Sequence, residues 1–149
     1  MALDGTGTRP ADRALGFDRF VFDRFDFVYL PSRDVAADVA HFTAGLGGEL
    51  VFAIERFGTR VAMVRLAGGG PELLLAQHLE GDQPILVFRV EDLDAAIEEL
   101  GGREVALGSH FEMPFGVGVE LSGPGPQRVA IYERTRPERG DSLAGRRDF

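Results

Sequence analysis

The spacing of hydrophobic residues along the chain changes repeatedly between the two-residue period of a strand and the longer period of a helix. The stretch "FDFVYLPSRD" (25–34) predicts a strand that stops at a proline and leads to a capping aspartate, Asp34. Apolar residues then recur every three or four positions between 35 and 46, which predicts a helix that a glycine pair ends. Further strands are expected at 49–57, 60–66 and 72–77. The first half therefore predicts the order β-α-β-β-β.

The same order begins again after a polar link at 78–83. The stretch "PILVFRVEDLDAAIEELGG" predicts a strand, a capping aspartate at Asp92 and a helix. Asp92 follows Asp34 by 58 residues, and Ile85 follows Phe27 by the same number. Shorter strands are expected around "REVAL", "GVGVELS" and "RVAIYE". An internal repeat of this length predicts two β-α-β-β-β modules, at 25–78 and 84–133.

The two ends of the chain differ from the modules. The N-terminal arm, 1–24, contains nearly all of "FDRFVFDRF" (17–25), whose phenylalanines have to pack on something. We favour an extension of the first strand that covers a neighbouring subunit over a lid on a pocket. The C-terminal tail, 134–149, is polar and broken by glycine and proline, so we expect it to be flexible.

Composition excludes several kinds of chemistry. The 149 residues include no cysteine and no lysine, which excludes disulfides, thiolate metal sites, cysteine nucleophiles and lysine Schiff bases. The net charge of −8 argues against nucleic acid or an anionic membrane as a partner. No apolar run approaches the ~20 residues of a membrane span, and the first residues lack the features of a signal peptide. We therefore expect a cytoplasmic protein.

Three stretches together resemble the vicinal oxygen chelate superfamily, which includes glyoxalase, extradiol dioxygenases and the bleomycin-resistance binding proteins. They are "VYLPSRDVAADVAHF", "VFRVEDLDAAIEEL" and "MPFGVGVELSGPGPQRVAIYE", and the resemblance covers about 25–133. It implies an α+β fold in which the two β-α-β-β-β modules form a curled eight-stranded sheet around a cleft.

The resemblance also implies where a metal would be held. Enzymes of the superfamily carry histidine, glutamate or glutamine on the first and last strands of each module. In this chain those positions fall on Phe27, Leu74, Ile85 and Ala130. Hydrocarbon side chains cannot coordinate a divalent cation, so we expect no metal and no cofactor there. The donors for a displaced metal site would be His78, His110, Glu112 and Glu120.

The cleft is expected to be mostly apolar and aromatic. Strand alternation puts Phe25 and Tyr29 on the same side as Phe27, and Asp26 on the opposite side. The candidate ligand-binding residues are Phe27, Tyr29, Leu74, Ile85, Val87, Met113, Phe115, Arg128, Ala130 and Tyr132. A filled core has the same composition, so a closed cleft is an alternative to an open pocket.

Three functions are compatible with this pattern. The leading hypothesis is a metal-free binding protein resembling the bleomycin-resistance branch, which sequesters or carries an apolar or aromatic small molecule. The acidic charge favours a cationic ligand, and the branch implies a homodimer. The second is an enzyme, an isomerase, lyase or dioxygenase, that uses a displaced metal or acid–base groups among Tyr29, Tyr132, His110 and Glu112. The third is a scaffold whose cleft is filled.

Overall fold

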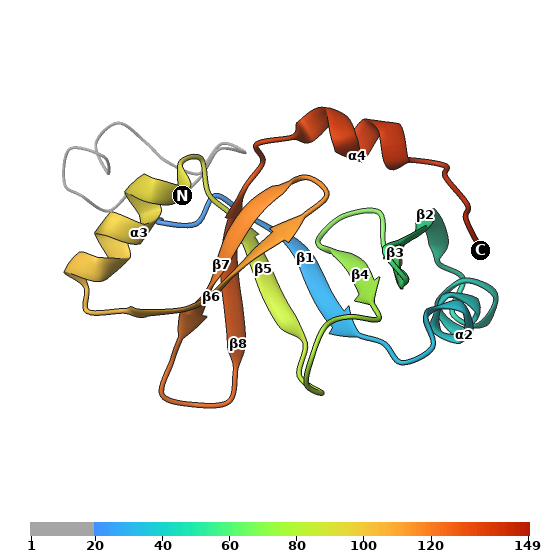
Figure 1. Ribbon diagram of the computed structural model, residues 1–149, viewed down its shortest axis with the longest axis horizontal. Helices are drawn as coiled ribbons and strands as arrows, with labels where there is room; N and C mark the ends of the chain where they lie inside the picture. Colours follow the sequence, from blue (N-terminus) through green and yellow to red (C-terminus); the bar gives the residue numbers. More distant parts are fainter. Residues whose placement is uncertain (1–19) are drawn as a thin grey trace, which may run out of the picture.

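The two halves of the chain form one continuous eight-stranded sheet in the computed structural model, which describes residues 20–149 (Figure 1). The first half contains β1 (Arg24–Pro31), α2 (Val35–Ala40), the π-helical turn η1 (His41–Gly45), β2 (Glu49–Arg56), β3 (Thr59–Arg65) and β4 (Glu72–Ala76). The second half contains β5 (Ile85–Arg89), α3 (Leu93–Gly102), β6 (Ala106–Met113), β7 (Gly116–Ser122), β8 (Arg128–Glu133) and α4 (Pro137–Leu143). None of the helices in the described part of the chain is long and apolar enough to cross a membrane.

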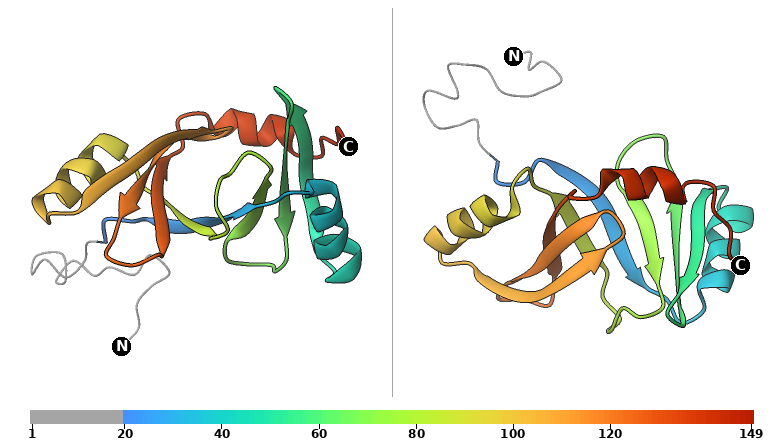
Figure 2. Two further views of the ribbon diagram at one scale, coloured as in Figure 1. Left: turned by 60° about the horizontal axis from the view of Figure 1, so that its bottom comes forward. Right: turned by 45° about the horizontal axis from the view of Figure 1, so that its top comes forward.

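The two β-α-β-β-β units join through their first strands. The strand order is β2-β3-β4-β1-β5-β8-β7-β6, with β1 and β5 antiparallel at the centre. Each of these strands also pairs in parallel with the last strand of its own unit, β1 with β4 and β5 with β8. The predicted α+β class is confirmed, and both units of the sheet come from the same chain. Figure 2 shows the sheet curving, with α4 lying across its open side.

The two helix starts that suggested the repeat have equivalent local structures. Asp34 Oδ1 accepts a hydrogen bond from the amide of Ala37, and Asp92 Oδ1 accepts one from the amide of Ala95, each at 3.0 Å. An aspartate in this position satisfies an amide that has no partner within the first turn of a helix. Equivalent caps 58 residues apart are therefore what the repeat predicted.

Buried side chains form separate clusters on the two faces of the sheet. On the concave face, one cluster draws on both units and includes Phe27, Phe52, Phe115 and Tyr132. On the other face, α3 covers a cluster of the second unit and α2 covers a cluster of the first. Both units contribute to a single surface at the concave face, so a site shared between them would lie there.

The sixth strand lies further along the chain than the sequence predicted. We expected it around "REVAL" (103–107), but β6 runs from Ala106 to Met113. The backbone amides of residues 103–105 bond back to the last turn of α3, and Glu104 has a φ of +63°. These residues therefore close the helix, and the strand starts after them.

The segment after β8, residues 134–149, is the predicted C-terminal tail. It contains α4, whose Leu143 packs against the concave cluster, and an extended stretch along β2. The amide of Ala53 donates to the carbonyl of Arg146 at 2.8 Å, and the amide of Asp148 donates to the carbonyl of Ala53 at 2.7 Å. Phe149 packs against the cluster under α2. Two well-spaced apolar residues thus fasten a segment whose average composition is polar.

The described part of the N-terminal arm is an approach to β1. Val21 and Phe22 pack against the cluster under α3, and the amide of Asp23 donates to the carbonyl of Arg89 at 2.8 Å. Phe20, in contrast, is 85% exposed. The remainder of the predicted arm, 1–19, lies outside the described residues.

Candidate functional site

A cavity of about 300 Å³ opens on the concave face, between the strands of the first unit, β8 and α4. Its floor is apolar and is formed by Phe27, Phe52, Met63 and Phe115. Its rim is charged and includes Arg24, Arg65, Glu72, Arg134 and Asp141. An apolar floor with a few polar groups around it is the usual composition of a small-molecule site.

The floor is a group of aromatic rings from both units. The ring centroid of Phe27 lies 5.4 Å from that of Phe115, in a nearly parallel stack, and 5.5 Å from that of Tyr132. Phe52 meets Phe115 edge-on at 6.2 Å. These separations are within the range in which aromatic rings attract one another. Phe27 thus connects the first unit to the second at the bottom of the cavity.

A bulge in β1 decides which side chains face the cavity. Phe25 pairs with Phe88 and Phe27 pairs with Val87, so Asp26 is an extra residue in β1. Phe25 consequently lies on the outer face, stacked on Phe88 at 4.6 Å, while Asp26 and Phe27 both line the cavity. The predicted sides of Phe25 and Asp26 are therefore wrong, because the bulge interrupts the alternation of the strand.

Asp26 is the centre of a hydrogen-bond network in the cavity wall. Its side chain is 7% exposed, and its Oδ2 accepts a hydrogen bond from Arg89 Nε at 2.7 Å. The same oxygen accepts a hydrogen bond from the hydroxyl of Tyr132 at 2.5 Å. Burial and the hydrogen bond to Asp26 raise the pKa of Tyr132 well above its usual range. Tyr132 is therefore a neutral donor, and the donors compensate the carboxylate for lost hydration.

No protein-family model and no curated protein sequence matches the chain. Solved structures do match. Methylmalonyl-CoA epimerase from Mycobacterium tuberculosis gives a TM-score of 0.64 at 19% identity, over 77% of this chain and 90% of that one. Methylmalonyl-CoA epimerase from Streptomyces coelicolor, in a variant complexed with 2-nitronate-propionyl-CoA, gives 0.62 at 17% identity, over 76% of this chain and 99% of that one. The chain has the vicinal oxygen chelate fold. At these identities the likeness extends to the fold alone.

In this vicinal oxygen chelate fold, the four positions that the resemblance assigned to a metal are packed together in the core. Leu74 and Ala130 have no exposed surface, Ile85 is 2% exposed and Phe27 is 8% exposed. All four belong to the concave cluster. The open cavity therefore begins beside Phe27 and extends towards α4, away from the other three positions.

The donors considered for a displaced metal site have separate surroundings. His78 Nε2 lies 3.2 Å from the hydroxyl of Tyr29, whereas Glu112 lies 3.7 Å from Arg136. Glu120 is paired with Arg128. Across residues 20–149, no three histidine or acidic side chains come close enough together to hold a metal ion.

The ten predicted ligand-binding residues fall into three groups. Phe27, Phe115 and Tyr132 line the cavity. Tyr29, Leu74, Ile85, Val87, Met113 and Ala130 are buried in the same concave cluster without lining the cavity. Arg128 lies elsewhere, where it donates to Glu120 at 2.6 Å and to the carbonyl of Glu80 at 2.9 Å. Asp26, Arg89 and α4 were not among the predicted site residues, since neither the bulge nor the docking of α4 has a clear sequence signal.

Ionisation of Tyr29 should lower the free energy of unfolding at high pH. Burial raises the pKa of Tyr29 from 10.0 to about 12, because its charged form would lose hydration. The unfolded chain therefore releases this proton first, and the stabilisation is complete below pH 10 and is lost as the pH rises to about 12. We expect Tyr29 to contribute a loss of about 3 kcal/mol in the free energy of unfolding over that interval, measured by denaturant titration. The raised pKa of Tyr132 adds a loss of the same sign. Tyr29→Phe should therefore make this part of the pH profile less steep, and an unchanged profile would contradict the assignment.

Proposed function

We propose that this protein binds a small molecule with an apolar or aromatic body in the cavity above Phe27, without using a metal. The observation that carries the proposal is a single open cavity with an aromatic floor and a charged rim. A filled core does not need an open apolar hollow with arginines around it, whereas a ligand site uses both the hollow and the charges. The hydrocarbon side chains at the four metal positions support a metal-free site, since they offer no donor atoms.

One observation favours an enzyme as the second candidate. Asp26 lines the cavity beside Tyr132, so a carboxylate and a phenol lie where a substrate would sit. However, Asp26 Oδ2 already accepts hydrogen bonds from Arg89 and Tyr132. A general base needs an oxygen directed at the proton that it removes, and these two donors leave only Oδ1 for that role, 3.7 Å from the guanidinium group of Arg24. We therefore favour binding over catalysis.

A thermal-shift screen tests the proposal. Small aromatic compounds should raise the melting temperature in proportion to the logarithm of their concentration, whereas Mn²⁺, Ni²⁺ and Zn²⁺ should leave it unchanged. Phe27→Ala should lose the response, and Phe57→Ala, at a side chain that is 99% exposed, serves as the matched control. About one metal ion per chain in protein purified without chelators would overturn the metal-free site. Conversion of a bound compound would favour the enzyme.

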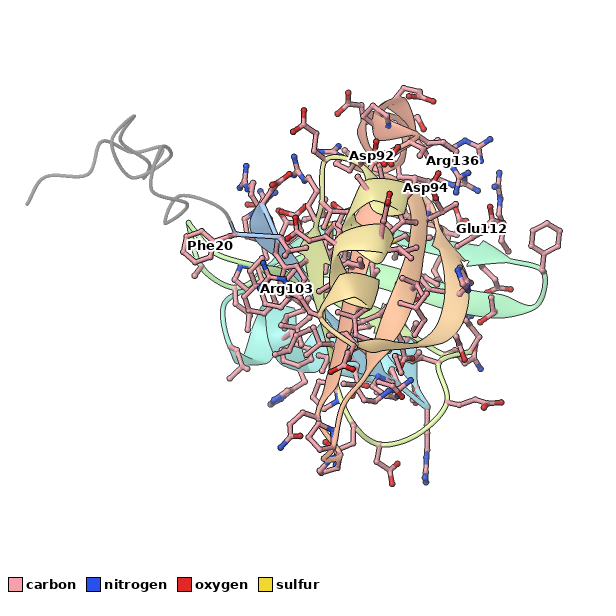
Figure 3. The ribbon with its side chains drawn as sticks, turned by 90° about the vertical axis from the view of Figure 1, so that its left-hand side faces the viewer. Phe20, Asp92, Asp94, Arg103, Glu112 and Arg136 are labelled. Atoms are coloured by element: carbon pink, nitrogen blue, oxygen red, sulfur yellow. The ribbon has the colours of Figure 1, made fainter. Side chains whose placement is uncertain are left out.

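The homodimer remains part of the proposal. Phe20 projects beside an apolar groove of about 420 Å³ whose lining includes Phe22, Phe25, Phe88 and Leu100. Figure 3 shows Phe20 and Arg103, which also borders the groove, on the same side of α3. A two-fold interface needs a surface that complements itself, and a projecting ring next to an apolar groove meets that condition. We infer that the ring of one copy occupies the groove of the other.

Sedimentation at micromolar concentration should give twice the mass of the 16.2 kDa chain. Phe20→Asp should shift the protein towards the single-chain mass, because it places a charge in an apolar contact. Phe57→Asp changes another exposed phenylalanine and should leave the mass unchanged. A wild-type protein that sediments as a single chain would reject the dimer.

A further inference from the structure

We propose that the cavity selects an anionic ligand, in which a carboxylate meets the arginine rim and a flat apolar body lies on the phenylalanine floor. The inference rests on the proposed function and names the chemical class of its ligand. It reverses the expectation of a cationic ligand, which came from the charge of the whole chain. The charges around the cavity differ in sign from the net charge of the whole chain.

The charged groups around the cavity leave an excess of positive charge. Four arginines line it, Arg24, Arg65, Arg89 and Arg134, and so do three carboxylates, Asp26, Glu72 and Asp141. Two ion pairs cancel within the wall, since Arg65 lies 2.7 Å from Glu72 and Arg89 lies 2.7 Å from Asp26. Arg24 and Arg134 then face a single carboxylate, in a chain whose net charge is −8. A positive opening on an acidic molecule is a local arrangement that favours an anion.

Among residues 20–149, Arg24 and Arg134 are the two cavity arginines that donate no hydrogen bond to a carboxylate. The side chain of Arg24 is 69% exposed, and its Nε lies 3.7 Å from Asp26 Oδ1, which is beyond hydrogen-bond distance. Arg134 is exposed, and among residues 20–149 no carboxylate forms an ion pair with it. A guanidinium group binds a carboxylate through two parallel hydrogen bonds, and this geometry is stronger than a single contact.

Asp26 does not prevent an anion from binding. Its charge is balanced by the ion pair with Arg89, and its Oδ2 accepts hydrogen bonds from both Arg89 and Tyr132. The acidic group of the ligand would therefore lie at the rim, towards Arg24 and Arg134, with its apolar part directed at Phe27. The exposed position of the rim also predicts that added salt weakens the binding, because it screens charges in contact with water.

The volume limits the body of the ligand. About 300 Å³ is at the small end of ligand cavities, which suits a single ring with a short side chain. Phenylacetate is therefore a suitable probe. Phenylacetamide has nearly the same shape without the charge, and 2-phenylethylamine carries the opposite charge.

Calorimetric titration of the full chain with these three probes at low salt tests the inference. Phenylacetate should bind at least tenfold more tightly than phenylacetamide, and 2-phenylethylamine should bind most weakly. Arg134→Gln and Arg24→Gln should each reduce the affinity for phenylacetate severalfold and leave that for phenylacetamide unchanged. Arg139→Gln, an exposed arginine of α4 that does not line the cavity, is the matched control and should change neither affinity.

The outcomes separate this inference from the function on which it rests. Equal binding of the acid and the amide, or a preference for the amine, would overturn the anionic selectivity and leave a small-molecule site in place. If Phe27→Ala binds none of the three probes, the probes bind in this cavity of the wild-type protein. If none of the probes binds wild-type protein at millimolar concentration, the proposed site itself fails, and the anionic class fails with it.

Discussion

Phe27→Ala is expected to lower the free energy of unfolding by about 3 kcal/mol and to weaken ligand binding at least tenfold. The ring is 8% exposed and stacks on Phe115 at 5.4 Å, so its removal leaves a hole in the packing. The hole joins an existing cavity, which water can enter, so we expect the lower end of the range seen for buried phenylalanines. Denaturant titration and calorimetry with the probe ligand measure the two effects.

Phe57→Ala is the control for that measurement. Phe57 lies in the turn between β2 and β3 and is 99% exposed, so its truncation should change stability by less than about 0.5 kcal/mol. If Phe27→Ala were as mild as this control, the ring group would not be part of the core, and the proposed floor of the site would have to be abandoned.

Leu143→Asp is expected to detach α4 from the concave face while the eight strands remain paired. Leu143 is 9% exposed and packs against the same cluster as Phe27, and burying a carboxylate there without a partner would cost several kcal/mol. The helix would escape this cost by undocking. Because α4 and the residue that follows it supply Asp141 and Ala144 to the cavity wall, ligand affinity should fall at least tenfold.

Limited proteolysis distinguishes undocking from unfolding. In Leu143→Asp, cleavage should concentrate after β8, and the fragment that ends there should keep its strand content by circular dichroism. Ser142→Asp changes the neighbouring exposed residue of α4 and should leave the cleavage pattern unchanged. An identical pattern in wild-type protein and Leu143→Asp would show that α4 is not held through this side chain.

The fold was predictable because its signals are local and occur twice. Asp34 and Asp92 each cap a helix that has one apolar face, and each follows an apolar strand. Such a cap forms between residues that are close in the sequence, because the aspartate side chain accepts a hydrogen bond from the amide three residues later. The repeat then limits the topology, since two equivalent units can bury their apolar faces by pairing with one another.

The candidate site was less predictable because it depends on contacts between distant parts of the chain. Alternation along β1 gave the wrong side for Phe25, since a one-residue bulge leaves no reliable mark on composition. The docking of α4 depends on Leu143, and the end of the segment after it is held by Phe149, so two apolar residues anchor a polar segment. The average composition of such a segment indicates that most of it faces water. It does not show that a few buried side chains are enough to anchor the segment.

In genetic terms, the bulge in β1 corresponds to a single codon. Phe25 already pairs with Phe88 and Phe27 with Val87, so the strand on either side of Asp26 keeps its register with or without the extra residue. One in-frame insertion is therefore enough to add a carboxylate to an apolar wall without turning either neighbour to the other face of the sheet. A substitution at an existing position of the strand has to replace a side chain that already packs. The vicinal oxygen chelate fold can thus acquire a charged group in its cleft while every aromatic residue that forms the floor stays in place.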